Sequence, residues 1–231
     1  MLIGTKMRLS NAEVLRVEVT NGDETKILIG EKSLKLLGVH IDQNLDWNRQ
    51  ITHVKQKAVN SIRNLNRINQ LIPMKQRRIL YTSLVTPHFS YADIIWNNCG
   101  SSNCNKIQQA QNYAAKSMLG LGKSTSSTQA LKKLEMIPLH DKRKINLAAL
   151  EEKAPENIQN LYLKQQSFQK NRATEKRILN FPKHKLQLYQ EGTFYTSIKA
   201  WNAVPTHLKN TTLTTFKKNL QTYTTKQYFK T

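Results

Sequence analysis

Paired carboxylates are the first feature to look for in this chain, because a two-metal site needs neighbouring acids to hold its ions. Tyr91-Ala-Asp93 matches the start of a Tyr-x-Asp-Asp box, but position 94 is Ile, so the second acid is missing. The surroundings are apolar and predict helix, whereas a metal-binding box of this kind needs a hairpin turn. We therefore expect Asp93 to cap a helix or to form an ion pair near Pro87, and not to bind a metal.

The remaining reactive residue types are also explained without chemistry. Asp42 and Asp46 share one turn, where a turn residue and a helix cap account for both. Cys99 and Cys104 have no second Cys/His pair at ligand spacing, which predicts two reduced, partly buried thiols in an intracellular protein. The six histidines are scattered, and there is no phosphate-binding glycine loop or nucleophile elbow. The sequence therefore assigns no catalytic residue, no metal ligand and no cofactor to this chain.

Positive charge is the dominant feature of the 231 residues, with a formal net charge of +21. Residues 1–50 hold seven basic and seven acidic side chains, whereas residues 51–134 hold twelve basic residues and one acid, and residues 135–231 hold seventeen and seven. A surface of one sign favours a polyanionic partner through counterion release. A solvated basic face that only confers solubility, or contact with an acidic membrane surface, are the alternatives.

The sequence contains neither an 18-residue apolar run nor a signal peptide. These absences predict a protein that is not secreted and does not enter a membrane. We expect an intracellular location, nuclear or cytoplasmic.

Residues 1–46 predict three or four short, mostly antiparallel strands. Leu15, Val17 and Val19 alternate with charged residues, which is typical of a half-buried strand, and residues 21–23 are Asn-Gly-Asp, a strong turn signal. Two further apolar strands are expected at 26–29 and 34–41. This is too little sheet to be stable alone, so it should pack against the helices that follow or against a missing domain.

After residue 46 the apolar residues recur at helical spacing. The sequence predicts a helix over 47–68, started by Asp46. A second helix begins near Pro73 and is broken at Pro87, and its second half carries residues 89–96. Further helices are expected at 101–118, 129–136, from Pro138 to 150, and at 155–163, 194–205 and 213–223. Residues 164–192 predict a poorly ordered linker. The expected fold is α+β and predominantly α-helical, a small antiparallel N-terminal sheet followed by a helical bundle.

Basic residues gather on these predicted helices, with Tyr81, Tyr91 and Tyr113 between them. Cations presented by helices hold a duplex backbone without reading its sequence. The candidate nucleic-acid-binding residues are Lys55, Lys57, Arg63, Arg67, Lys75, Arg77, Arg78, Lys132, Lys133, Lys142, Arg143 and Lys144.

Several landmarks, in order along the chain, resemble the C-terminal part of the reverse transcriptase of non-LTR (LINE-like) retrotransposons. They are Met1-Leu-Ile-Gly4, Leu34-Lys-Leu-Leu-Gly-Val-His-Ile-Asp-x-x-Leu-x-Trp47, Tyr81-x-Ser-Leu-Val-x-Pro-x-x-x-Tyr-x-x-x-Ile-Trp96, Gln108-Gln-Ala-Gln-Asn112, Met118-Leu-Gly120, and Trp201-Asn-x-x-Pro205 with Phe194 before it and Phe216-Lys-x-x-Leu220 after it. Each match is short, and together they span almost the whole chain.

The resemblance implies a division of the chain and a role for each part. Residues 1–46 would be the last strands of the polymerase palm, with Leu37, Gly38 and Val39 at or beside the hairpin that grips the primer. Residues 47–150 would be the helical thumb, which holds the template–primer duplex, and residues 151–231 a C-terminal extension. The family's catalytic aspartates, which bind Mg²⁺, lie upstream in the palm, and the fingers precede them. The chain is thus expected to be inactive alone as an RNA-directed DNA polymerase and to hold RNA–DNA or DNA duplex.

Two alternatives remain open at this point. The chain could be a stand-alone basic helical module that binds RNA or a protein partner, or a decayed retroelement reading frame without selected function. The sequence lacks the Cys/His knuckle that some family members carry, and it also lacks endonuclease motifs. It does not indicate an oligomeric state.

Overall fold

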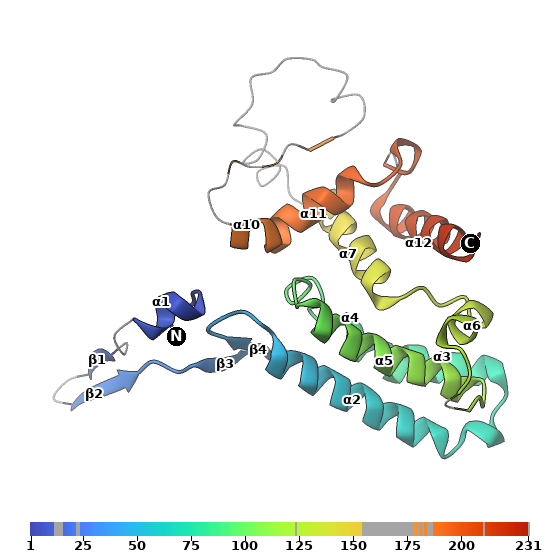
Figure 1. Ribbon diagram of the computed structural model, residues 1–231, viewed down its shortest axis with the longest axis horizontal. Coiled ribbons are helices and arrows are strands. Elements are labelled where there is room, and N and C mark those ends of the chain that lie inside the picture. Colours follow the sequence, from blue (N-terminus) through green and yellow to red (C-terminus); the bar gives the residue numbers. More distant parts are fainter. Residues whose placement is uncertain are drawn as a thin grey trace.

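The computed structural model shows an α+β fold that is predominantly helical, with antiparallel strands near the N-terminus followed by helices (Figure 1). This confirms the predicted fold class. The structure describes residues 1–11, 16–21, 24–122, 124–153, 178–179, 181, 183, 187–209 and 211–230. Among these residues, no helix is both long and apolar enough to cross a membrane.

Two separate hairpins form the strand region. After the short helix α1 (Lys6–Ser10), β1 (Arg16–Asn21) pairs with β2 (Glu24–Ile29), and β3 (Ser33–Leu36) pairs with β4 (Val39–Asp42), both antiparallel. The single strand predicted over 34–41 is therefore wrong. Leu37 and Gly38 both have positive φ, 46° and 85°, which is the geometry of a two-residue hairpin turn and reverses the chain between Leu36 and Val39.

The β1–β2 hairpin extends away from the helices (Figure 1) and is exposed. Val17 and Val19 keep 46% and 45% of their surface accessible, and Ile27, Leu28 and Ile29 on the partner strand keep 58%, 48% and 65%. The prediction of a half-buried strand is thus wrong, because neither face of this hairpin is covered by any described element.

One hydrophobic core joins the first helices. They are α2 (Asn48–Asn66), the 3₁₀ turn η1 (Asn69–Leu71), α3 (Met74–Leu84), α4 (Thr86–Ser90), α5 (Ser101–Met118) and α6 (Ser127–Lys133). Ile51, Ala58 and Ile62 of α2 are 0–2% exposed and pack with Trp96 and Ile107. These α2 residues are seven and four positions apart, which agrees with the predicted inward stripe.

The ends of these helices follow the expected chemistry. The Ser126 hydroxyl accepts a hydrogen bond from the Gln129 backbone N–H at 3.5 Å and caps α6. At the end of α5, Gly120 has φ 65° and the Leu121 N–H returns to the Lys116 carbonyl oxygen at 2.9 Å, a Schellman arrangement that satisfies the last carbonyls. The predicted boundaries of α5 at 101 and 118 are confirmed.

The segment after Pro87 departs from the prediction. The helix expected to carry residues 89–96 ends at Ser90, and residues 91–95 form turns, with Tyr91 extended (ψ 117°) and Ala92 at φ 52°. Tyr91 and Ile95 are exposed, whereas Trp96 is fully buried and its Nε1 donates to the Tyr91 carbonyl oxygen at 3.2 Å. The burial of Trp96 and its hydrogen bond to Tyr91, rather than helical periodicity, determine the backbone path of residues 91–96.

A second core lies on the C-terminal side. It joins α7 (Leu139–Lys153), α11 (Thr193–Asn202), the 3₁₀ turn η2 (Thr206–Leu208) and α12 (Leu213–Lys230), and a short α10 (Gln187–Glu191) precedes α11. Trp201 and Phe216 pack at its centre with ring centroids 5.5 Å apart. Because α7 supplies Ile145, Ala148 and Ala149 to this core, α7 packs with the C-terminal helices. The division at residue 150 stays a prediction, and the helix predicted at 155–163 and most of the linker at 164–192 fall outside the described residues.

Candidate nucleic-acid interface

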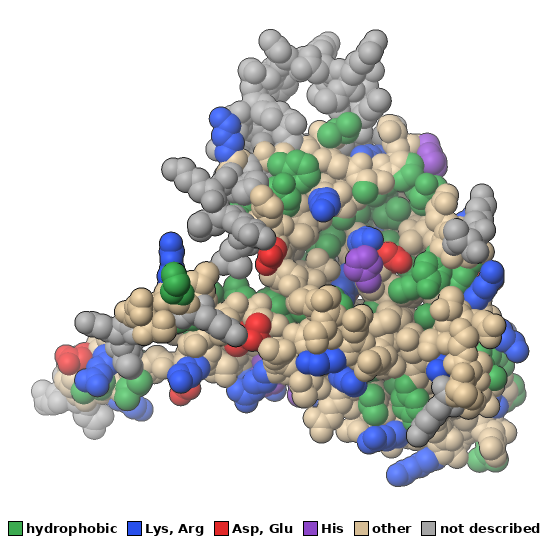
Figure 2. Space-filling view, in the orientation of Figure 1, with side chains coloured by type: hydrophobic (Ala, Val, Ile, Leu, Met, Phe, Trp, Pro, Cys, Tyr) green, Lys and Arg blue, Asp and Glu red, His purple; other side chains and the backbone are tan. Residues whose placement is uncertain are grey.

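The helical body from α2 to α6 exposes positive charge without a compensating acid. Between positions 47 and 134 the sequence has one acidic residue, Asp93, and it is 5% exposed. In the part of the chain that the structure describes, the cations of α2 and α3 take part in no ion pair. Figure 2 shows Lys and Arg side chains along α2 at the lower edge of the molecule. The exposed predicted residues of this body are Lys57, Arg63, Arg67, Lys75, Arg78, Lys132 and Lys133.

A groove of about 330 Å³ runs between α2 and α5 within this basic surface. Lys55, Val59 and Arg63 line it from α2 at i, i+4 spacing, and Gln109, Ala110 and Tyr113 line it from α5. Lys55 Nζ donates to Gln109 Oε1 at 3.4 Å, and Asn66 Nδ2 donates to the Tyr113 hydroxyl at 2.9 Å. The groove thus presents two cations, an amide and an aromatic ring, which suit phosphate, sugar and base contacts respectively.

Three histidines near the start and middle of α2 lie within the field of these cations. The pKa of His53 is lowered by burial and by Lys57, and the pKa of His40 is lowered by burial and by Arg49. Burial also lowers the pKa of His88, with a further contribution from Lys57. Burial and the surrounding cations therefore both disfavour the protonated form of these three rings.

Two of the twelve predicted residues are part of the protein's internal structure. The Arg77 guanidinium donates to the carbonyl oxygens of Ile72 and Met118 at 2.9 and 3.0 Å, which ties the start of α3 to the end of α5. Arg143 is 3% exposed, and its guanidinium carbon lies 4.5 Å from the centroid of the Trp96 ring. Arg143, one of the candidate nucleic-acid-binding residues, is thus directed by α7 into the first core and away from the surface.

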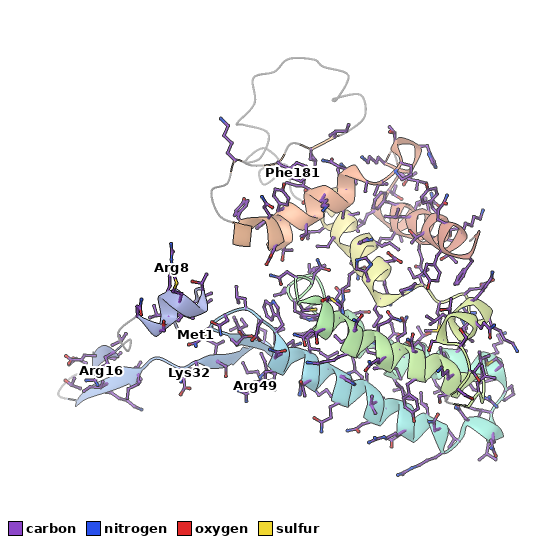
Figure 3. The ribbon with its side chains drawn as sticks, in the orientation of Figure 1. Met1, Arg8, Arg16, Lys32, Arg49 and Phe181 are labelled. Carbon is purple, nitrogen blue, oxygen red and sulfur yellow. The ribbon has the colours of Figure 1, made fainter. Side chains whose placement is uncertain are left out.

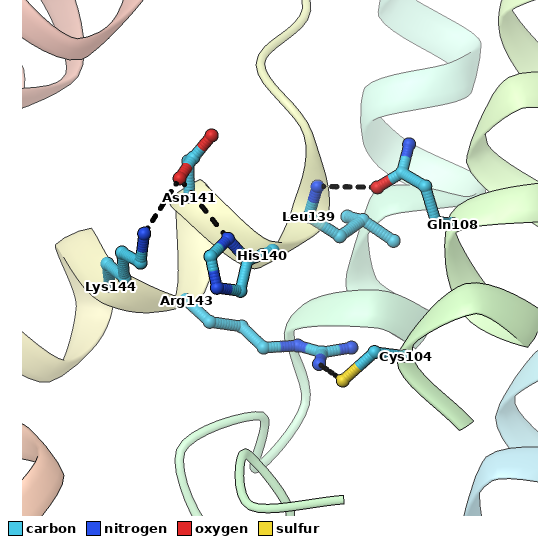
Figure 4. Close-up of polar contacts among 7 residues, drawn as sticks. All are labelled: Cys104, Gln108, Leu139, His140, Asp141, Arg143 and Lys144. Carbon is cyan, nitrogen blue, oxygen red and sulfur yellow. Dashed lines mark hydrogen bonds and ion pairs between the residues drawn. The ribbon is translucent and has the colours of Figure 1, made fainter. Parts of the chain in front are cut away.

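Its neighbours on α7 differ in exposure. Burial lowers the pKa of Lys142, against the opposing effect of Asp93, whereas Lys144 is exposed and pairs with Asp141 at 3.3 Å (Figure 4). Asp141 also lies 3.3 Å from His140 Nδ1 (Figure 4). Among the three basic residues at 142–144, Lys144 is therefore the one accessible to a polyanion, and the Asp141 carboxylate already offsets its charge.

Asp93 is neither a helix cap nor part of an ion pair among the described residues, which corrects the expectation for it. Its Oδ2 accepts a hydrogen bond from Asn146 Nδ2 at 2.7 Å, and burial raises the pKa of its carboxyl group. The described residues contain no group of three or more His, Cys, Asp or Glu side chains that could hold a metal ion. Asp93 lies on a turn between Tyr91 and Trp96 and joins that turn to α7.

The hairpin tip at Leu37, Gly38 and Val39 is fixed to the helical body. The Tyr91 hydroxyl donates to the Leu37 carbonyl oxygen at 2.5 Å, while the Leu37 side chain is 84% exposed. Val39 is 5% exposed and belongs to the first core. The tip therefore presents an apolar side chain to solvent from a backbone held at both ends.

The joint between the β3–β4 hairpin and α2 sets where this tip stands relative to the basic helix. The Asp42 carboxylate accepts hydrogen bonds from the backbone N–H groups of Asn44 and Asp46 at 3.1 Å and of Trp47 at 2.9 Å. Asp46 Oδ1 accepts from the Asn48 N–H at 2.9 Å, but α2 begins at Asn48 and its N-cap residue is Trp47, whose side chain makes no capping hydrogen bond. The predicted turn role of Asp42 is confirmed, whereas the prediction that Asp46 caps this helix is wrong, because Trp47 takes a left-handed conformation (φ 63°) and the helix starts one residue later. Figure 3 marks Lys32 just before β3 and Arg49 in the first turn of α2.

Buried polar side chains, which sequence patterning does not detect, complete the joint. Trp47 Nε1 donates to Asn98 Oδ1 at 2.7 Å, and Asn103 Nδ2 donates to the Asp46 carbonyl oxygen and to Asn48 Oδ1 at 3.0 and 2.9 Å. Gln50, 2% exposed, accepts the His40 N–H at 2.9 Å. Asn and Gln are ordinary surface residues in a sequence, so only their position opposite Trp47 and β4 reveals this role.

Sequence reasoning did not place Gln109 and Tyr113 in one groove with Lys55 and Arg63. The signal available was their spacing of four residues beside the apolar stripe of α5. Comparison of the chain with protein-family models, with curated proteins and with solved structures found no significant match in any of the three.

Proposed function

We propose that the helical body α2–α6 grips a nucleic-acid duplex along its phosphate backbone, independently of sequence, as the thumb-like part of an RNA-directed DNA polymerase. The observation that carries this proposal is the one-signed surface: the only acid of residues 47–134 is buried at 5% exposure. The exposed surface of α2 and α3 therefore repels cations and attracts polyanions.

Counterion release supplies the driving force. Each phosphate that a Lys or Arg neutralises releases condensed cations from the duplex, and the logarithm of the binding constant falls with the logarithm of salt by about 0.9 per contact for B-form DNA. With Arg63 and Arg67 on the outer side of α2 and Lys75 and Arg78 on α3, four exposed charges lie on two consecutive helices. Contacts of this type position a duplex and carry no sequence information.

The hairpin tip supports the same proposal from the other side of the joint. Leu37 is held by Tyr91 and stands beside the start of α2 through the Asp42 turn. In the proposed complex the tip contacts the end of the primer strand while the helices hold the duplex beyond it. Catalytic metal ions, Mg²⁺ in the resembled family, would be bound by palm residues upstream of this chain.

Titration of fluorescent duplexes with the full chain tests the proposal. Fluorescence anisotropy is measured with a short RNA–DNA hybrid and with a DNA duplex, each in two unrelated sequences, from ~50 to ~200 mM salt. We expect similar affinity for the two sequences and a steep loss of affinity with salt. Arg63→Gln/Arg67→Gln should weaken binding of all duplexes alike.

The β1–β2 hairpin offers a matched control. Arg16 and Lys26 are exposed there, and Arg16→Gln/Lys26→Gln removes the same two charges outside the helical body. This control should bind nearly as well as the parent chain. If both double variants weaken duplex binding equally, the effect comes from net charge and not from the surface of the helical body. If affinity falls for only one of the two duplex sequences, the alternative of a specific RNA-binding module is favoured.

A further inference from the structure

The two cysteines of the chain approach each other beside a buried cation. Cys99, 5% exposed, precedes α5, and Cys104 lies in the first turn of α5, where it is partly exposed. Their sulfur atoms are 3.4 Å apart, and Cys104 Sγ lies 3.2 Å from the Cys99 carbonyl oxygen. A disulfide bond is about 2.05 Å long, so the pair needs an approach of little more than an ångström to close.

Arg143 is directed at both sulfur atoms. One terminal nitrogen of its guanidinium lies 3.6 Å from Cys104 Sγ and 3.8 Å from Cys99 Sγ, and Figure 4 shows this side chain reaching from α7 to Cys104. The guanidinium is 3% exposed over Trp96, its Nε has no hydrogen-bond partner, and among the described residues it forms no ion pair. A buried cation is stabilised by a nearby anion, and the groups it faces can supply one as a thiolate.

The two thiols are electrostatically unequal. The hydrogen bond with Cys99 and the nearby Arg143 together lower the pKa of Cys104 to about 6, against the opposing effect of burial. The same pairing, together with burial, raises the pKa of Cys99. Cys104 is therefore the partner that carries negative charge near neutral pH, and it is also the partner that solvent reaches.

We propose that Cys104 is a nucleophilic thiol that reacts with low-molecular-weight disulfides and that Cys99 resolves the product into a Cys99–Cys104 disulfide. In the first step the Cys104 thiolate attacks one sulfur of a disulfide RSSR, a mixed disulfide forms, and RS⁻ leaves. In the second step Cys99 loses its proton to solvent and attacks Cys104 Sγ, releasing the second RS⁻. Two electrons pass from the two cysteines to RSSR, which ends as two thiols.

Glutathione disulfide is the probe, with the intact chain as the substrate. The chain has only these two cysteines, so a loss of about 2 Da in intact mass identifies the internal disulfide. Cys99→Ser should stop the reaction at a mixed disulfide on Cys104, and Cys104→Ser should leave Cys99 nearly unreactive. A chain that stays fully reduced under conditions that oxidise a free dithiol would overturn the proposal.

The pH dependence of alkylation gives a second readout that does not depend on closing the bond. The measurement uses the parent chain, because Cys99→Ser would remove the thiol that lowers the pKa of Cys104. Labelling of Cys104 by iodoacetamide is followed by the mass of its peptide. The rate should rise with a midpoint near pH 6, about the value set by its surroundings. Arg143→Gln should move the midpoint upward, while Arg16→Gln, at an exposed arginine on β1, should leave it unchanged.

Folding of Arg143→Gln is checked by circular dichroism, and Arg143→Lys serves as a second variant that keeps the charge. A midpoint near 8.5 in the folded parent chain, as for a free cysteine, would contradict the role given to Arg143. The proposal is independent of nucleic-acid binding, because neither cysteine belongs to the exposed cationic surface.

Discussion

The Tyr91 hydroxyl donates a hydrogen bond to the Leu37 carbonyl oxygen, 2.5 Å away and 54 positions earlier in the chain. The bond joins a turn that follows α4 to the tip of the β3–β4 hairpin. Gly38, at φ 85°, lies against the same ring, since a Cβ at this position would be 3.6 Å from a Tyr91 ring carbon. One exposed tyrosine therefore sets the position of the hairpin tip relative to the helices.

Tyr91→Phe should release the tip while leaving the core intact. Loss of one hydrogen bond is expected to cost about 0.5–1.5 kcal/mol in the free energy of unfolding, measured by urea denaturation. Amide hydrogen exchange at Gly38 and Val39 should accelerate. Tyr113→Phe is the control, because it removes a hydroxyl on α5 that accepts a hydrogen bond from Asn66 of α2. It should leave amide exchange at the hairpin tip unchanged. Identical exchange at the tip in both variants would contradict the clamp.

Asp42→Ala should loosen the joint far more than Asp46→Ala. Asp42 accepts three backbone N–H groups and Asp46 accepts one, so the expected losses are roughly 2–4 and about 1 kcal/mol in the free energy of unfolding. Both acids lie on one short turn, which makes each a control for the other. Equal losses in urea denaturation would show that the Asp42 bonds are replaced by water.

Asp93→Asn should change the pH dependence of stability and leave nucleic-acid binding unaffected. Burial raises the pKa of Asp93 in the folded chain, so above its unfolded value the folded state binds more protons and loses stability as pH rises. An Asn residue still accepts the Asn146 bond and does not ionise. The variant should therefore gain stability relative to the parent as pH rises from about 4 through the folded pKa. A difference in the free energy of unfolding between the variant and the parent that does not change with pH would show that the Asp93 carboxylate is solvated in the folded chain.

Duplex binding should strengthen as the pH falls from about 7.5 to about 6. Burial lowers the pKa of His53, as does Lys57, and a bound polyanion offsets this positive field, so the complex takes up protons. Anisotropy measured at the two pH values gives the affinity ratio, and His53→Gln should reduce it. NMR titration of the ring should show its pKa rising on binding. A fall in affinity on acidification would argue against a phosphate near α2.

Acid has the opposite effect on the free chain. Burial lowers the folded pKa values of His40, His53 and His88 below the ordinary histidine value of about 6.5. Between the folded pKa values and that ordinary value, the unfolded state therefore binds more protons than the folded state. Their contribution to stability is present at neutral pH and is lost as pH falls through the folded pKa values. Thermal unfolding with and without a saturating duplex should therefore diverge on acidification.

Local rules predicted the helices, and tertiary contacts decided the turns. The apolar spacing of Ile51, Ala58 and Ile62 predicted α2 to within two residues, and Ser126 and Gly120 supplied the expected start and stop signals. Residues 89–96 failed because the burial of Trp96 outweighs helical periodicity in so short a segment. The alternation of residues 34–41 missed the turn at 37–38, although the family resemblance implied a hairpin at or beside these residues, because Leu is unusual at positive φ and only the Tyr91 bond shows why it is tolerated.

The candidate interface was predictable in part for the same reason. Exposed cations such as Arg63 and Arg67 could be assigned from their place off the apolar stripe of α2. Arg143 could not, since its neighbours in sequence are also basic and only the packing of α7 against Trp96 distinguishes it. Likewise, the 3.4 Å approach of the two cysteine sulfur atoms depends on the turn before α5, which residue spacing does not specify.

Because the helical body has a single acid and this acid is buried, positive charge is distributed unevenly along the chain. Residues 1–50 are neutral, and the next 84 carry a net charge of +11, so the chain has a strong electrical polarity. Near an anionic polymer this polarity exerts a torque before any contact forms, turning the helices inward and the β1–β2 hairpin outward. In the proposed complex, the exposed valines and isoleucines of that hairpin would therefore face the surrounding solution.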